Sequence, residues 1–128
     1  MEFLEDLNIK GMTCPPKGAL PHKLIVYRLV DNMPITVKDI WSYRALYPVK
    51  VFRADECKAR ACSVFADCEE AKNLQKMPKF RKKKIVLINI EKKDGVLLNT
   101  PGRMGKSHHS WWIAKEFDVS SDNIKEAI

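Results

Sequence analysis

Long apolar runs are missing from this sequence of 128 residues. Its most apolar stretches, such as "LIVY" and "IVLINI", are far shorter than the roughly 20 residues that cross a bilayer. The opening "MEFLEDLNIK" is acidic and has neither the basic nor the apolar region of a secretory signal. We therefore expect a protein that stays in the cytoplasm and has no membrane partner.

Closely spaced cysteine pairs are missing as well. The chain contains Cys14, Cys57, Cys62 and Cys68, and none of their spacings is the Cys-x2-Cys that most structural zinc sites use. A protein without an export signal keeps its thiols reduced in the cytoplasm. We expect four reduced cysteines that pack as small apolar residues, and no metal site.

A third absence concerns "TPGRMGKSHHSWW", which contains the Gly-Lys-Ser that ends a phosphate-binding P-loop. That motif needs a glycine five residues before Gly105, where this chain has Thr100, and Pro101 removes one N–H donor from the loop. The residues that follow, "HHSWWI", predict a strand instead of the required helix. The pattern therefore argues against a P-loop ATPase or GTPase.

The net charge of +7 is concentrated in one segment of the chain. Between Lys76 and Lys106 there are ten lysines and arginines but two acidic residues. The centre of this segment is "KFRKKK", and its polyanion-binding candidates are Lys79, Arg81, Lys82, Lys83 and Lys84. Such a cluster attracts phosphate-bearing partners, including nucleic acid, but it is also typical of a solvated turn before a strand.

The hydrophobic pattern predicts an α+β fold, with a mixed or antiparallel sheet and a few short helices in a single domain. The prolines of "CPPKGALP" make residues 1–23 an irregular N-terminal arm, and residues 24–128 form the domain. Strands are expected at residues 23–30, 49–53, 62–65, 85–90, 96–99 and 108–113, and helices after Thr36, after Asp67 and after Ser120 or Ser121.

Arg28 is the unusual residue of the first expected strand, "KLIVYRLV". A guanidinium keeps its proton, and burying it without a partner costs free energy. Arg28 therefore either pairs with a nearby acid at the rim of the sheet or lines a cleft where an anionic ligand meets it. Its planar fork suits a phosphate group.

Ser63 completes a pattern with Arg28. The chain from "VYRLV" through "PITVKDIWSY" to "CSVFADCEEA" resembles small uncharacterised bacterial proteins with a Tyr-Arg strand and a Ser-Val-Phe strand followed by Glu-Ala. More distantly, the strand Arg and the strand Ser resemble the first two elements of the Arg-Ser-Glu class of ADP-ribosyltransferases. That resemblance implies that Arg28 holds the phosphates of NAD and that Ser63 supports the nicotinamide-ribose pocket. The third element, a catalytic glutamate, has no clear match in this chain.

The segment "SHHSWW" carries the remaining candidates. Neighbouring side chains of a strand point to opposite faces, so at most one of His108 and His109 faces a given pocket. A histidine beside a tryptophan can donate a proton, hold a phosphate or stack on a nicotinamide, and it can equally be a half-buried strand residue. The ligand-binding candidates near these histidines are Arg103, Lys106, Trp111 and Trp112.

The leading hypothesis is a cleft for a phosphate-bearing small molecule, with Arg28, Ser63 and His108 or His109 as catalytic residues. In the transferase-like case the ligand derives from NAD, which is the candidate cofactor. The alternatives are a nucleic-acid-binding module that uses the basic segment 76–106, and a protein-partner-binding module without a small-molecule site. Convergence of Arg28, Ser63 and one histidine in a single pocket would favour the leading hypothesis.

Overall fold

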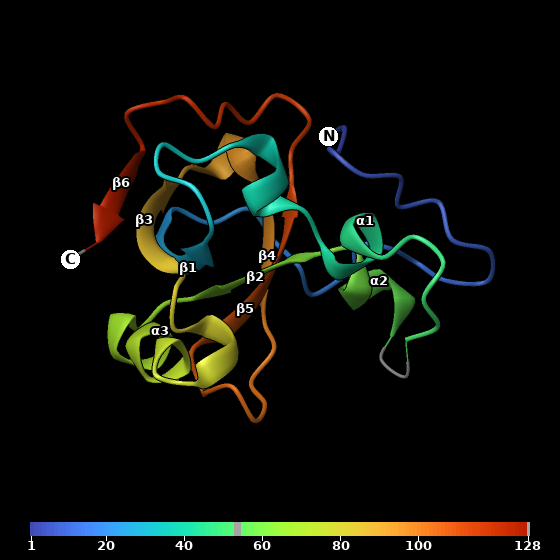
Figure 1. Cartoon of the computed structure of the whole chain (residues 1–128). Helices are drawn as coiled ribbons and strands as arrows, with labels where there is room; N and C mark the ends of the chain where they lie inside the picture. Colours follow the sequence, from blue (N-terminus) through green and yellow to red (C-terminus); the bar gives the residue numbers. More distant parts are fainter. Residues whose placement is uncertain (53–54, 128) are drawn as a thin grey trace.

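Six strands form one antiparallel sheet in the computed structural model, which describes residues 1–52 and 55–127 (Figure 1). The strands are β1 (Leu24–Val30), β2 (Cys62–Phe65), β3 (Lys84–Ile90), β4 (Gly95–Asn99), β5 (His108–Ile113) and β6 (Ile124–Ala127). Their order across the sheet is β4-β5-β2-β1-β3-β6, and neighbouring strands run antiparallel. Since short helices accompany this sheet, the predicted α+β class is confirmed.

The apolar residues of β1 and β3 explain why these two strands lie inside the sheet. β1 pairs with β3 along its whole length. Val26, Val86 and Ile88 are fully buried in the main hydrophobic cluster. Branched apolar side chains pack well on a pleated surface, so this pair forms the stable centre to which the other strands attach.

Three short α-helices occur in the described residues, and they are α1 (Tyr43–Leu46), α2 (Glu56–Ala59) and α3 (Cys68–Gln75). α3 begins where the sequence predicts, because the side chain of Asp67 accepts a hydrogen bond from the backbone N–H of Glu69. α2 directly precedes β2 along the chain and α3 directly follows it. Figure 1 shows the consequence, with α1 and α2 near one end of β2 and α3 near the other.

The helix expected after Thr36 is divided in two. Its first part is a 3₁₀ turn, η1 (Val37–Ile40), and its second part is α1. Trp41 and Ser42 between them are extended, and the side chain of Ser42 caps α1 by accepting a hydrogen bond from the N–H of Ala45. Two further 3₁₀ turns, η2 (Pro78–Phe80) and η3 (Lys92–Asp94), flank β3.

Two expected elements are not found. Residues 49–52 form no strand, and the last residue of that expected strand, Arg53, lies outside the described residues. The expected C-terminal helix is wrong, because Ile124–Ala127 form β6 and pair with β3. The free side of β3 offers backbone groups that a strand can pair with, whereas a helix this short would be marginal by itself.

The N-terminal arm lies against β4 and β5. Residues 1–23, all of them described, contain isolated bridges but no helix or strand. Leu4 N–H donates to the carbonyl of Ile113, and Leu20 exchanges hydrogen bonds with Leu97. A disulfide between Cys14 and Cys57 ties the arm to α2, so the expectation of four reduced cysteines is wrong for this pair. The arm brings together two residues 43 positions apart, which spacing alone could not reveal.

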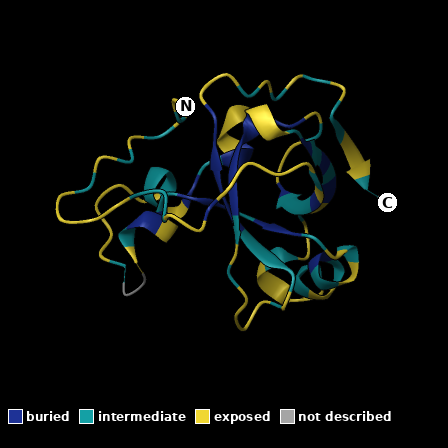
Figure 2. Ribbon diagram, turned by 180° about the vertical axis from the view of Figure 1, so that it is seen from behind, coloured by how far each residue is buried: buried dark blue, intermediate teal, exposed yellow. Residues whose placement is uncertain are grey.

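Buried residues are concentrated along the strands, while the loops and helix surfaces carry the exposed residues (Figure 2). Among the described residues, no helix combines the length and the apolar character needed to cross a bilayer.

Candidate functional site

A cleft of about 460 Å³ lies over β2 and β5 and is bounded by α1, α2, α3 and η2. The cleft lies here because α2 directly precedes β2 and α3 directly follows it, so the two helices stand at opposite ends of this strand. Volumes of this size are typical of small-molecule sites. Four positively charged side chains line the cleft, namely Arg28, Lys58, Lys79 and Lys83. Among the residues described there, no aspartate or glutamate lines it.

Two serines and a histidine form the floor of the cleft. In the β2–β5 register Ser63 is opposite Ser110, and Phe65 is opposite His108. Paired residues of an antiparallel ladder share a face, so these four side chains point to the same side of the sheet. Ser63, Ser110 and His108 therefore line one cleft together with Arg28, which is the convergence that the leading hypothesis requires.

Arg28 is held by backbone carbonyls and has no ion pair with a described residue. Its Nε donates to the carbonyl of Asp39 at 2.7 Å, its Nη1 to Ser63 at 2.7 Å and its Nη2 to Trp41 at 3.3 Å. β1 and β2 pair only at Tyr27 and Phe65 in the described residues, and the guanidinium links the two strands beyond that point. The carbonyls accept three of its five N–H groups, so its positive charge remains available to an anion in the cleft.

The Asp39 carboxylate stabilises the turn that presents these carbonyls. It accepts hydrogen bonds from the backbone N–H groups of Thr36 and Asp31 at 2.8 and 3.0 Å. Burial by itself would raise the pKa of Asp39, but these hydrogen bonds outweigh it and lower the pKa below its ordinary value. Asp39 is therefore charged at neutral pH and satisfied within its own turn.

His108 presents a free ring nitrogen. Its Nδ1 lies 2.9 Å from the carbonyl oxygen of Thr100, which can only accept, so Nδ1 carries the proton of the neutral ring. Burial lowers the pKa of His108 and favours that neutral form. Nε2 makes no hydrogen bond to another described residue, so it can accept a proton or a hydrogen bond from a ligand.

The Gly-Lys-Ser motif has a structural role at the rim of the cleft. The backbone N–H and the hydroxyl of Ser107 both donate to the Glu70 carboxylate, at 3.0 and 2.9 Å. Gly105 has φ = 143°, and a Cβ at this position would collide with Glu70. These contacts fasten the β4–β5 loop to α3, and the same loop supplies Pro101 and Met104 to the cleft.

Several predicted site residues lie away from the cleft. His109 faces the other side of the sheet, where its Nδ1 donates to the carbonyl of Ser107. Arg103 and Lys106 are exposed in the β4–β5 loop and do not line the cleft. In the basic segment Lys79 and Lys83 line the cleft, with Lys83 also 2.9 Å from Asp31, whereas Arg81, Lys82 and Lys84 are exposed outside it.

The two tryptophans are core residues, so the expectation that they bind ligand has no support in their placement. Trp111 is fully buried, and its ring N–H donates to the carbonyl of Asp94. Trp112 is 1% exposed, and its ring N–H donates to the carbonyl of Cys57. Trp112 shares its strand face with Ser110 but lies farther along β5, where α2 and the arm cover it.

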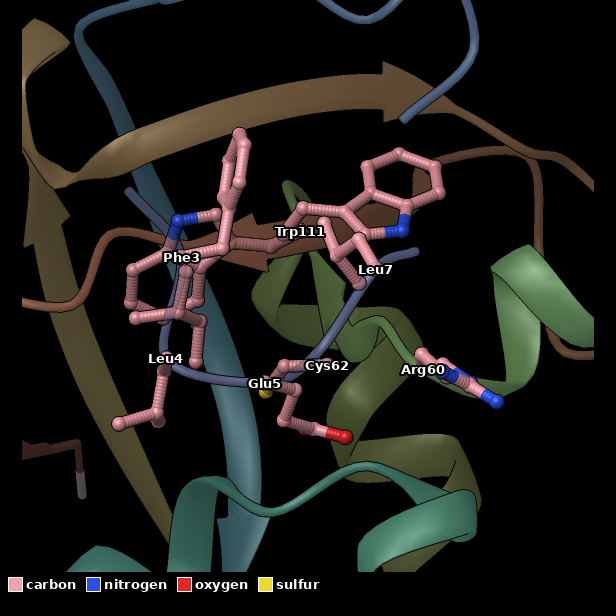
Figure 3. A pocket seen from close by; sticks show the side chains of 9 residues that line it. Phe3, Leu4, Glu5, Leu7, Arg60, Cys62 and Trp111 are labelled. Carbon is pink, nitrogen blue, oxygen red and sulfur yellow. The ribbon is translucent and has the colours of Figure 1, made fainter. Parts of the chain in front are cut away.

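A second cavity lies beneath the arm and is lined by residues including Glu5, Cys62 and Trp111 (Figure 3). Its volume of about 10 Å³ is that of one water molecule at most, which is too small for a ligand. The Glu5 carboxylate accepts a hydrogen bond from the Ser42 hydroxyl at 2.6 Å, although burial raises its pKa. This cavity is therefore part of the packing of the arm.

Sequence reasoning missed the aromatic lining of the cleft. Trp41, Tyr43, Tyr47, Phe52, Phe65 and Phe80 all contribute to its walls. The signal was present in "WSYRALY", since Tyr43 and Tyr47 stand at i and i+4 and so share one face of a helical turn. Each of these two tyrosines is about half exposed.

The chain matches no protein-family model, no curated protein and no solved structure.

Proposed function

We propose that the cleft binds a phosphate-bearing small molecule. The observation that carries this proposal is the charge of the lining, with Arg28, Lys58, Lys79 and Lys83 around a volume of about 460 Å³. Such a surface attracts anions, and a partly enclosed site strengthens each contact relative to open water. Arg28 is preorganised for this role because the carbonyl contacts hold its fork in place.

The chemistry of the floor supports proton transfer next to the bound anion. His108 offers an unprotonated Nε2, and the hydroxyls of Ser63 and Ser110 lie on the same floor. NAD is one ligand of the proposed class, as the resemblance to ADP-ribosyltransferases implies. Transferase catalysis would also need a glutamate beside the ligand, and the described lining supplies none, so we limit the proposal to binding.

Calorimetric titration with inorganic pyrophosphate and with NAD, at low ionic strength, tests the proposal. Replacing two exposed cleft cations, Lys58→Gln with Lys79→Gln, should weaken binding by roughly tenfold, because charge-assisted contacts to phosphate are lost. The matched control is Lys92→Gln with Lys93→Gln, which removes the same charge from the exposed η3 turn. Equal weakening in both double variants, or no binding by the parent protein, would contradict the proposal.

Nucleic acid is the second candidate ligand. The observation in its favour is that the basic segment continues from the cleft, through Lys79 and Lys83, to the exposed Arg81, Lys82 and Lys84. In the same titrations a single-stranded oligonucleotide serves as an additional probe. If it binds more tightly than the small anions, and replacement of Arg81, Lys82 and Lys84 by Ala flattens its salt dependence, nucleic acid is the better assignment.

We propose the cytoplasm as the location, as the sequence indicates. The Cys14–Cys57 disulfide argues the other way, since compartments that keep thiols reduced rarely contain one. Labelling of free thiols in cells lysed directly into denaturant, which exposes the buried Cys62, distinguishes the two locations. Four labelled cysteines agree with the cytoplasm, and labelling of Cys62 and Cys68 alone agrees with an oxidising compartment.

A further inference from the structure

One wall of the cleft is aromatic, and the Arg44 side chain contacts several parts of it, while Lys50 lies over the Tyr47 and Phe52 rings. The wall consists of Tyr43, Tyr47 and Phe52, from α1 and the loop that follows it, and we call it the aromatic wall. The Tyr43 and Phe52 rings lie 6.3 Å apart between centroids. Tyr43 is 51% exposed and Tyr47 is 50% exposed, so much of this ring surface faces solvent.

Arg44 makes the contacts that order this wall. Its Nε and Nη2 donate to the two oxygens of the Glu56 carboxylate, at 2.7 and 2.9 Å. Its guanidinium carbon lies 4.7 Å from the centroid of the Phe52 ring, which is a cation–π contact. Its Nη1 donates to the carbonyls of Tyr47, Pro48 and Lys50, so the loop wraps around one guanidinium.

These contacts indicate that the wall is preorganised for a flat apolar partner. The loop contains no helix or strand within residues 47–52, and without Arg44 its aromatic side chains would have many conformations. Arg44 restricts the loop before any ligand binds, through its bidentate pair with Glu56, its contact with the Phe52 ring and its hydrogen bonds to the loop carbonyls. Half-exposed aromatic rings held in a fixed geometry are the kind of surface on which nucleobases stack.

We infer that the aromatic wall is a base-binding subsite and that the ligand of the cleft is a nucleoside phosphate. This inference rests on the proposed phosphate-binding function. The base stacks against the wall formed by Tyr43, Tyr47 and Phe52, while the phosphate meets the cations of the cleft, Arg28 among them. Arg44 acts through the wall and is a positioning residue, because its own donors are taken by protein acceptors.

The test separates the base from the phosphate by using AMP, UMP, ribose 5-phosphate and adenosine as probes in calorimetric titrations. AMP should bind at least roughly tenfold more tightly than ribose 5-phosphate, which has the same sugar and phosphate but no base. Tyr47→Ala should remove most of that difference and leave binding of ribose 5-phosphate unchanged. Tyr47→Phe keeps the ring and should bind AMP as the parent does.

Arg44→Lys tests the positioning role, since an ammonium cannot form the bidentate pair or reach the same carbonyls. It should weaken AMP binding toward the ribose 5-phosphate level while the affinity for ribose 5-phosphate is retained. Circular dichroism of each variant verifies folding, and Tyr47→Ala is expected to fold because the side chain is half exposed.

Equal binding of AMP, UMP and ribose 5-phosphate by the parent would overturn the base subsite and leave the phosphate site standing. Absence of binding by all three would remove the phosphate site and the subsite with it. Adenosine binding as tightly as AMP would overturn the nucleoside phosphate as the ligand. A single-stranded oligonucleotide that binds far more tightly than AMP, in a Tyr47-dependent manner, would assign the wall to nucleic acid instead.

Discussion

One end of the β2–β5 pair borders a cleft and the other end is covered by the N-terminal arm, although both ends belong to the same strands. At one end Ser63 and His108 form the floor of an open cleft of about 460 Å³. At the other end Trp112 is 1% exposed, and the cavity that it helps to line beneath the arm is about 10 Å³. A single residue separates the cleft-lining Ser110 from the fully covered Trp112.

The difference shows that alternation along a strand does not by itself decide which side chains border a cleft. Ser110 and Trp112 point to the same face of β5. The arm, tied to α2 through Cys14 and Cys57, covers the face at Trp112, whereas the face at Ser110 borders the cleft. What covers the strand determines whether a position becomes core or site.

The largest effect is expected where the arm covers the sheet. Trp112→Ala removes a ring packed against Ala19, Cys57 and Ala61, and it also removes the donor to the Cys57 carbonyl. The free energy of unfolding should fall by about 4 kcal/mol, as is common for a buried tryptophan truncated to alanine. Urea denaturation measures this change. A loss under about 1 kcal/mol, within the range of surface substitutions, would mean that the arm does not cover this end.

A smaller effect is expected at the boundary between the two halves, where Arg28 links β1 to β2. Arg28→Ala leaves the partly buried carbonyls of Asp39, Ser63 and Trp41 without their donor. We expect a loss of about 3 kcal/mol in the free energy of unfolding, at roughly 1 kcal/mol for each carbonyl. Arg28→Lys should fall between the parent and the alanine variant, because an ammonium cannot match the fork.

Arg103→Ala, at an exposed position in the β4–β5 loop, is the control for Arg28 and should change stability little. If Arg28→Ala melts like the parent but no longer binds pyrophosphate, Arg28 serves the ligand alone. The carbonyl contacts would then contribute nothing measurable to the fold.

The smallest effect concerns His108 and depends on pH. Burial lowers its pKa in the folded protein below the ordinary value of 6.5. Its contribution to stability is therefore fully present above pH 6.5 and is lost as the pH falls through the lowered folded value. Denaturation between pH 7 and pH 5 should show a steeper loss for the parent than for His108→Gln. The hydrogen-bonded Asp39 titrates below its ordinary value of 3.8, so its contribution is lost in a more acidic range.

Identical pH profiles for the parent and His108→Gln would mean that the ring is not buried in its neutral form. The floor of the cleft would then be as solvated as the loops, and the contrast with the covered end of β5 would be weaker.

Local patterns identified most of the strands and one helix. β1, β2, β3 and β5 lie within one residue of their expected ranges, and α3 begins after Asp67, because period, branching and capping act over a few residues. The C-terminal segment was misread as a helix, since its partner strand β3 is more than 30 positions away. The helix after Thr36 was read as continuous, and the extended backbone at Trp41 and Ser42 was missed.

The candidate site was also predicted only in part from the sequence. Arg28, Ser63 and His108 stood out in the sequence as polar groups on apolar strands, and all three line the cleft. The sequence could not choose between His108 and His109, because the choice depends on which face β2 and β5 turn toward the cleft. The sequence also did not indicate that Trp111 and Trp112 are buried, or that Arg44 holds the residues of the aromatic wall in place.

The sequence by itself determined the α+β class, the strongest strands, the cap of α3 and the positive charge between Lys76 and Lys106. These features depend on side-chain type and spacing within a few residues. Tertiary structure alone decided the Cys14–Cys57 pairing, the position of the arm and the three carbonyls that receive Arg28. Each of these joins residues far apart in the chain, and what such residues meet is set by how the whole sheet packs.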